Sequence, residues 1–218
     1  MGSIGSEKDR WIEMKIKLAA AKKSLLGDSI LSTAFVTYLG AFEGHYRQNI
    51  LREIWQPLVL QYQIQHTPTF NLPESLSNEE DIADWQLKGI PNDNQSIENM
   101  IILTETKDQK CPIFIDPQAQ ALKFMREFLS DSNFMTIKIS EASALAQLEF
   151  CIQRGGIAVC ENSGEVTHPA LLAILKKELM SVQGDQYIKF NDKQIPYEKS
   201  FMLYVFSELS SPHFSPEV

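Results

Sequence analysis

The sequence of 218 residues predicts an α/β fold, in which a mostly parallel sheet flanked by helices is preceded by a helical segment. In the C-terminal half, short apolar runs alternate with amphipathic helices, as in parallel strands that are joined by helical crossovers. In the first third, apolar residues recur at helical spacing. Residues 66–80 separate these two patterns, because Pro68 and Pro73 block regular structure there. We therefore expect a helical part over residues 1–65 and an α/β part over residues 66–218.

The N-terminal part has the pattern of three helices. In the first, apolar residues alternate in threes and fours along one face, as in a coiled-coil seam: Trp11, Met14, Leu18, Ala21 and Leu25. Gly27 is expected to stop or bend this helix, and residues 30–39 to form the second. The third helix is expected over residues 43–60, where Pro57 should kink or end it.

The α/β part begins with short helices and continues as alternating strands and helices. A helix is expected near Ser77, whose spacing to Glu80 is that of a capping box. Residues 96–103 fit a helix or a strand by periodicity, and we favour a helix. Strands are predicted at 111–115, 135–139, 157–160 and 201–206, helices at 120–129, 143–154 and 169–182, and a hairpin at 187–190 with 194–197.

Composition excludes several classes of protein. The formal net charge of -8, without clustered Lys and Arg, argues against a nucleic-acid partner. No apolar stretch is long enough to cross a bilayer and no hydrophobic leader follows Met1, so we expect a cytosolic protein without a membrane partner. Cys111, Cys151 and Cys160 are irregularly spaced, which predicts reduced and mostly buried thiols. The four histidines are equally scattered, and no metal site is expected.

The junction between the predicted strand 111–115 and the helix 120–129 is where α/β proteins bind phosphate. A working phosphate loop needs glycines, a lysine, and a Ser or Thr hydroxyl for magnesium. In this sequence Asp116 adds a negative charge, Pro117 removes an N–H donor, and Leu122 stands about where the lysine would be. An alternative is that Lys123 reaches into the corner. The residues of this degenerate corner are Asp116, Pro117, Gln118, Ala119, Gln120, Ala121, Leu122 and Lys123.

The second half of such a site would be an apolar strand that ends in two acidic residues, one for magnesium and one to activate water. The predicted strand 157–160 ends instead in Glu161 and Asn162. An amide does not take up a proton near neutral pH, so Asn162 cannot act as a general base. The residues alone leave two interpretations, namely polar caps at a strand end or relics of a hydrolytic pair.

Residues 115–121, with the sequence Ile-Asp-Pro-Gln-Ala-Gln-Ala, resemble the IDPQ(G)QA segment of the fifth AAA+ module of dynein heavy chains. In that module a normal phosphate loop has been replaced. The likeness covers nearly the whole chain, and further segments agree in order: Arg10-Trp11, Tyr38-Leu39-Gly40, Tyr46-Arg47, Gly89-Ile90-Pro91, Ser96-Ile97-Glu98-Asn99, Glu161-Asn162, Gly164-Glu165, His168-Pro169-Ala170-Leu171 and the residues 212–217. The resemblance favours the relic interpretation of Glu161 and Asn162.

The resemblance implies an AAA+ (P-loop NTPase-like) large subdomain that ends before its lid, preceded by the end of the returning stalk helix. It implies that an absent strand would cover residues 111–115, which would otherwise be an exposed edge. The seam that contains Trp11 lacks its partner strand here, so we expect it to fold back on the domain or fray.

The chain departs from the family at five positions. The family usually has glycine at Ala119, an asparagine at Ser211, an acidic residue at His168, and an Arg-Trp pair where Lys110 and Cys111 stand. Ser211 is included in the degenerate nucleotide pocket, where a shorter side chain weakens any sensing of a terminal phosphate.

On this resemblance the chain is a noncatalytic module that contributes to microtubule-based movement by bracing the ring, the stalk and the linker. The larger motor hydrolyses ATP with magnesium, whereas this module is expected to need no cofactor and no catalytic residue. Implied partners are the neighbouring modules and linker, with other dynein chains and microtubules through the larger protein, in the cytoskeleton of an axoneme. Two alternatives stay open: a regulatory module that holds ADP or ATP without hydrolysis, and a free-standing interaction protein.

Overall fold

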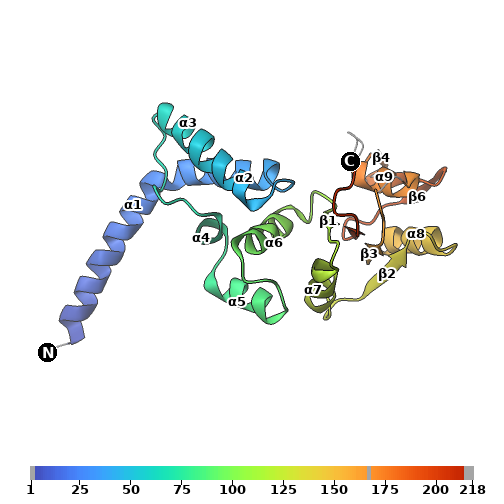
Figure 1. The fold of residues 1–218 in the computed structure, drawn as a ribbon, viewed down its shortest axis with the longest axis horizontal. Coiled ribbons are helices and arrows are strands. Elements are labelled where there is room, and N and C mark those ends of the chain that lie inside the picture. Colours follow the sequence, from blue (N-terminus) through green and yellow to red (C-terminus); the bar gives the residue numbers. More distant parts are fainter. Residues whose placement is uncertain (1–2, 166–167, 214–218) are drawn as a thin grey trace. The chain divides into compact units, whose positions relative to one another are not determined.

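The computed structural model describes residues 3–165 and 168–213. Its elements, which are drawn in Figure 1, form two compact units. The helical unit comprises residues 1–84 and 91–105, and the α/β unit comprises residues 85–90 and 106–218. The helix α5 (Glu79–Leu87) has residues in both units, and α6 (Asn94–Thr106) has its last residue in the α/β unit.

The first element is a single helix, α1 (Ser3–Tyr38), so the expectation that the helix stops at Gly27 and that residues 30–39 form a separate helix is wrong. Gly27 is buried, and a Cβ atom at this position would lie only 2.3 Å from the carbonyl oxygen of Gln65. The glycine therefore lets another backbone segment approach the helix closely rather than ending it. Close by, the Asp28 carboxylate accepts bonds from the backbone N–H and hydroxyl of Thr67, each at 2.7 Å.

The predicted seam on α1 is exposed to solvent. Trp11 is 71% exposed and Leu18 is 65% exposed, and all side chains of residues 7–23 are exposed to solvent. The expectation that this seam folds back on the domain is therefore wrong. The apolar side chains of the seam could be buried only by a second helix, which the described residues do not provide. The backbone of α1 is nevertheless helical over this stretch.

The third predicted helix is present over residues 44–61, and helical structure continues through Pro57 instead of ending there. It runs as α2 (Gly44–Asn49), a π-helical stretch η1 (Ile50–Trp55), and α3 (Gln56–Gln61). Pro57 lies in the first turn of α3, where its missing N–H is tolerated. The wider π-helical turn before it, in which the Gln56 N–H bonds to the Leu51 carbonyl, accommodates the ring.

The remaining helices of this unit are α4 (Leu72–Leu76), which the sequence analysis did not predict, α5, and α6 (Asn94–Thr106). The helix expected near Ser77 is capped instead by Asn78, whose side-chain oxygen accepts from the Asp81 N–H at 2.7 Å. The helical interpretation of residues 96–103 is confirmed. Asp93 caps α6 by accepting from the Ser96 N–H at 2.9 Å.

The α/β unit is built on a four-stranded parallel sheet in the order β1-β7-β3-β2, which confirms the predicted fold class. The strands are β1 (Ile113–Ile115), β2 (Phe134–Lys138), β3 (Ile157–Glu161) and β7 (Met202–Ser207). The helices are α7 (Gln120–Phe128), α8 (Ala144–Arg154) and α9 (Pro169–Lys176). Within the described ranges β1 pairs with β7 alone, which confirms the expected exposed edge.

A second sheet is antiparallel and follows α9. It consists of β4 (Leu179–Val182), β5 (Asp185–Phe190) and β6 (Lys193–Pro196). The predicted hairpin is confirmed, but the helix predicted to end at residue 182 ends at Lys176. Lys177 takes a left-handed conformation with φ 46°, and Gln183 and Gly184 form a turn that pairs β4 with β5.

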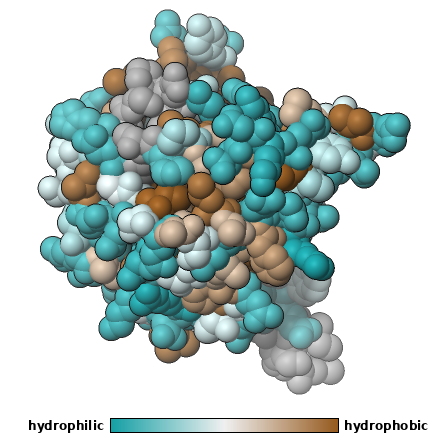
Figure 2. Space-filling view, turned by 90° about the vertical axis from the view of Figure 1, so that its right-hand side faces the viewer, coloured by the Kyte–Doolittle hydropathy of each residue, from teal (hydrophilic) through white to brown (hydrophobic). Residues whose placement is uncertain are grey.

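Buried side chains of the α/β unit fill the space between the sheets and helices α8 and α9, including Ile137, Leu148, Ile174, Ile188 and Val205. On the face drawn in Figure 2, hydrophobic residues gather near the middle among hydrophilic ones. Cys151 and Cys160 are buried and Cys111 is half-buried, all as free thiols. Among the described helices, none has the length and apolar character needed to cross a membrane.

Candidate functional site

The corner between β1 and α7 is organised around the carboxylate of Asp116. One carboxylate oxygen accepts from the Gln120 N–H at 2.9 Å, and the other accepts from the Leu122 N–H at 2.8 Å. The Asp116 N–H donates to the carbonyl of Ser207, at the end of β7, at 2.8 Å. Two amides in the first turn of α7 are therefore already bonded to a negative group of the chain itself.

The loop backbone is held in a conformation that normally favours glycine. Ala119 has φ 55° and ψ 27°, which is the left-handed region, and its N–H donates to the Asp116 carbonyl at 3.2 Å. This geometry explains why glycine is usual here in the resembling family, since an alanine Cβ is strained in that region. Pro117 supplies no N–H to the turn.

The other corner residues provide no buried cation. Leu122 and Ala121 are half-buried, and Gln118, Gln120 and Lys123 are exposed. A triphosphate needs free backbone amides and a positive charge, whereas two of the amides here already bond to a carboxylate. The residues of this corner do not fit a bound nucleotide and its magnesium. No group of acidic, histidine or cysteine side chains suited to a metal occurs among the residues that the structure describes.

Glu161 ends β3 as a buried residue and forms an ion pair with Arg126 of α7. Arg126 was missed by the sequence analysis, because 35 positions separate the two residues and no spacing rule pairs them. The pair joins α7 to the end of β3. The Glu161 carboxylate therefore takes part in a structural contact between these two elements.

Asn162 and the residues after it form a turn that is bonded to the end of β7. Asn162 is exposed and has φ 51°, a left-handed conformation that asparagine tolerates better than most residues. The Ser163 N–H donates to the Phe206 carbonyl at 3.0 Å, and the fully buried Ser207 hydroxyl donates to the Gly164 carbonyl at 2.6 Å. The sequence analysis missed Ser207, which directly follows the predicted apolar strand 201–206, and that position was the available signal.

Ser211 and His168, two further positions at which the chain departs from the family, have different roles. Ser211 is exposed in the segment after β7, and no bond joins it to Asp116 or Glu161 in the described part of the chain. His168, where an acidic residue is usual, caps α9 by accepting from the Ala170 N–H on Nδ1 at 3.2 Å. The imidazole thus performs the capping that a carboxylate would perform.

The parallel order β1-β7-β3-β2, the corner after β1 and the acidic end of β3 together define an AAA+ large subdomain of the P-loop NTPase type. The family described as "ATP-binding dynein motor region" matches residues 83–218, and "Microtubule-binding stalk of dynein motor" matches residues 1–59. The chain belongs to the dynein heavy-chain family.

Similar relatives include the dynein axonemal heavy chain 1 of Rattus norvegicus, at 35% identity, and that of Homo sapiens, at 34%, each over all 218 residues. The ciliary dynein beta chain of Tripneustes gratilla is 32% identical over 220 aligned residues. The chain spans about 5% of the length of each of these relatives.

Proposed function

We propose that this chain is a noncatalytic AAA+ module of a dynein heavy chain, corresponding to the fifth module of the motor ring. The observation that carries the proposal is the Asp116 carboxylate, which bonds the α7 amides that a nucleotide phosphate would otherwise bind. The Glu161 and Arg126 pair supports it, because the acidic end of β3 is engaged in a structural contact.

In this proposal residues 1–65 form the end of the returning stalk helix and its entry to the ring, and residues 66–218 form the large α/β subdomain. The module braces the ring, the stalk and the linker during microtubule-based movement. Its partners are the neighbouring modules and the linker, with other dynein chains and microtubules reached through the larger protein. The axonemal and ciliary names of the relatives support a place in the cytoskeleton of a cilium or flagellum.

Isothermal titration calorimetry of the chain with magnesium ATP, and separately with magnesium ADP, tests the absence of a nucleotide site. We expect no binding tighter than about 1 mM, which corresponds to roughly 4 kcal/mol. A micromolar Kd for either nucleotide would favour the alternative of a regulatory module that holds the nucleotide without hydrolysing it.

Glu161→Gln in an intact motor that carries this chain tests whether the module is catalytic. Because Gln keeps the shape of Glu161 and removes only its charge, the motor's ATPase rate should change by less than about twofold. The same change at the half-buried Glu149 of α8, Glu149→Gln, is a matched control. A loss of about a hundredfold specific to Glu161→Gln would contradict the proposal.

A further inference from the structure

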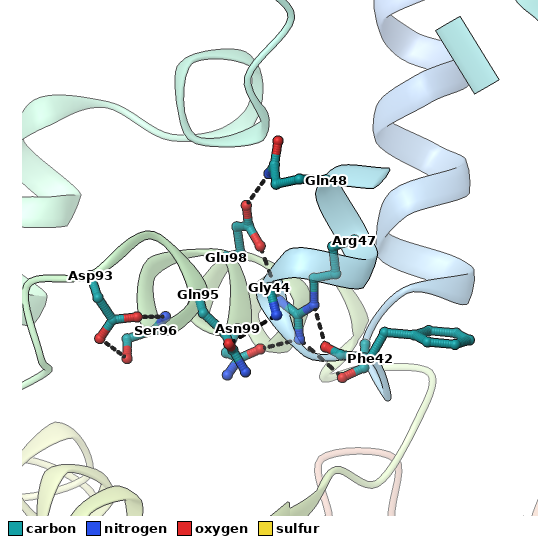
Figure 3. Close-up of polar contacts among 10 residues, drawn as sticks. Phe42, Gly44, Arg47, Gln48, Asp93, Gln95, Ser96, Glu98 and Asn99 are labelled. Atoms are coloured by element: carbon teal, nitrogen blue, oxygen red, sulfur yellow. Dashed lines mark hydrogen bonds and ion pairs between the residues drawn. The ribbon is translucent and has the colours of Figure 1, made fainter. Parts of the chain in front are cut away.

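A buried arginine lies at the centre of the helical unit. Arg47 of α2 is only 1% exposed, and its guanidinium makes hydrogen bonds in three directions (Figure 3). Nε donates to the Phe42 carbonyl at 2.7 Å, and Nη2 donates to the Gly40 carbonyl at 3.1 Å. These two carbonyls belong to the turn that follows the end of α1 at Tyr38. The guanidinium therefore holds the backbone at the base of the long helix.

The other side of the same guanidinium is bonded to α6. Nη1 donates to a carboxylate oxygen of Glu98 at 3.2 Å, and Nη2 donates to the Asn99 side-chain oxygen at 2.6 Å. Glu98 is itself 2% exposed, and its second oxygen accepts from the Gln48 side chain at 3.2 Å. A neighbouring bond, from the Gly44 N–H to the Gln95 side chain at 3.0 Å, joins the same two segments (Figure 3).

A buried ion pair of this kind is poor evidence of a gain in stability, because the two charges lose their hydration. Burial raises the pKa of Glu98, and the bond and charge of Arg47 oppose that rise. The pair instead holds its partners in fixed positions, since a planar guanidinium with several donors sets the direction of each hydrogen bond. The Phe35 ring of α1, 6.0 Å from the guanidinium carbon, adds a contact with the helix itself.

We propose that Arg47 is a positioning residue that fixes the end of α1 to α6, so that α1 moves as a rigid arm with α6. The arm begins where the long helix leaves the packed part of the unit, because the side chains of residues 7–23 are exposed whereas Leu31, Phe35 and Leu39 are buried. From the end of α6, the chain reaches β1 through residues 107–112. The inference does not depend on whether the Asp116 corner binds a nucleotide.

Electron paramagnetic resonance tests the inference on the 218-residue chain. Spin labels are placed at Lys22→Cys on α1 and Glu105→Cys on α6, both exposed positions of the helical unit, in a Cys111→Ser background that removes the half-buried native thiol. The distance distribution between the two labels should be narrow. Arg47→Lys keeps the charge but loses the planar set of donors, and it should broaden the distribution about twofold or more.

The matched control is Arg52→Lys, the same change at an exposed arginine of η1, which should leave the distribution unchanged. If Arg47→Lys does not fold, Asn99→Ala replaces it as the test variant. Asn99 is exposed, and its change to alanine removes only the bond that Arg47 Nη2 donates to it, so it should broaden the distance distribution to an intermediate degree. An unchanged distribution in folded Arg47→Lys, or in Asn99→Ala where Arg47→Lys does not fold, would overturn the inference.

Discussion

Asp116→Ala removes the group that occupies the N-terminus of α7. Two hydrogen bonds to backbone amides are lost, at 2.9 and 2.8 Å, together with a negative charge at the positive end of the helix. Loss of a capping side chain costs about 0.5–2 kcal/mol, and a charge at a helix terminus contributes about 0.3–1 kcal/mol. Gln120 is exposed, so water replaces part of the lost bonding, and we expect a net destabilisation of about 1–2 kcal/mol.

Two measurements follow this change. In urea unfolding monitored by circular dichroism, a slope of about 1–3 kcal/mol/M predicts that the midpoint falls by roughly 0.3–2 M. In native-state hydrogen exchange, the Leu122 amide should lose about tenfold or more of its protection, since it no longer donates to a carboxylate. Asp116→Asn should lose about half as much stability, because asparagine is also a good cap.

Asp131→Ala is the matched control, because Asp131 is an exposed aspartate in the turn after α7 and surface changes of this kind stay within about 0.5 kcal/mol. If Asp116→Ala and Asp131→Ala had the same midpoint and the same Leu122 protection, the carboxylate would not be capping α7. The main support for a noncatalytic corner would then be lost.

Three further changes give distinct results. Ala119→Gly should stabilise the protein by about 0.5–1 kcal/mol in urea unfolding, because it relieves a left-handed alanine, whereas Ala121→Gly inside α7 should destabilise it by a similar amount. Gly27→Ala should destabilise it by about 2 kcal/mol or more despite the higher helix propensity of alanine, since the Cβ would lie 2.3 Å from the Gln65 oxygen; equal or greater stability would refute the close approach. The polar and charged neighbours of Glu98 are Arg47, Gln48 and Asp93, and burial is the main cause that raises its folded-state pKa. The stability that Glu98 contributes is therefore fully present below pH 4.5, and it is lost as the pH rises through the folded-state pKa. The unfolding free energy of the parent minus that of Glu98→Gln should therefore fall with rising pH over this window, and a constant difference would contradict the assignment.

Local patterns were sufficient for much of the α/β unit. Alternating apolar runs predicted β1, β2, β3 and β7 to within a few residues, because a buried parallel strand needs a continuous apolar sequence. They failed at residues 179–182, where a left-handed Lys177 ended the helix and pairing with β5 produced a strand. Gly27 was misread for a related reason, since its role depends on a segment 38 positions further along the chain.

The sequence by itself determined the parallel α/β class and the family resemblance, and it predicted that the corner around Asp116 is unsuited to phosphate. These follow from residue types at fixed local spacings, which set charge, donors and backbone freedom. The tertiary structure alone decided that the Asp116 carboxylate bonds the amides of α7, that Arg126 pairs with Glu161, and that Arg47 joins the end of α1 to α6. The pairs formed by Arg126 and Arg47 join residues 35 and 51 positions apart, and only the packing of helices and strands brings such side chains within hydrogen-bonding distance.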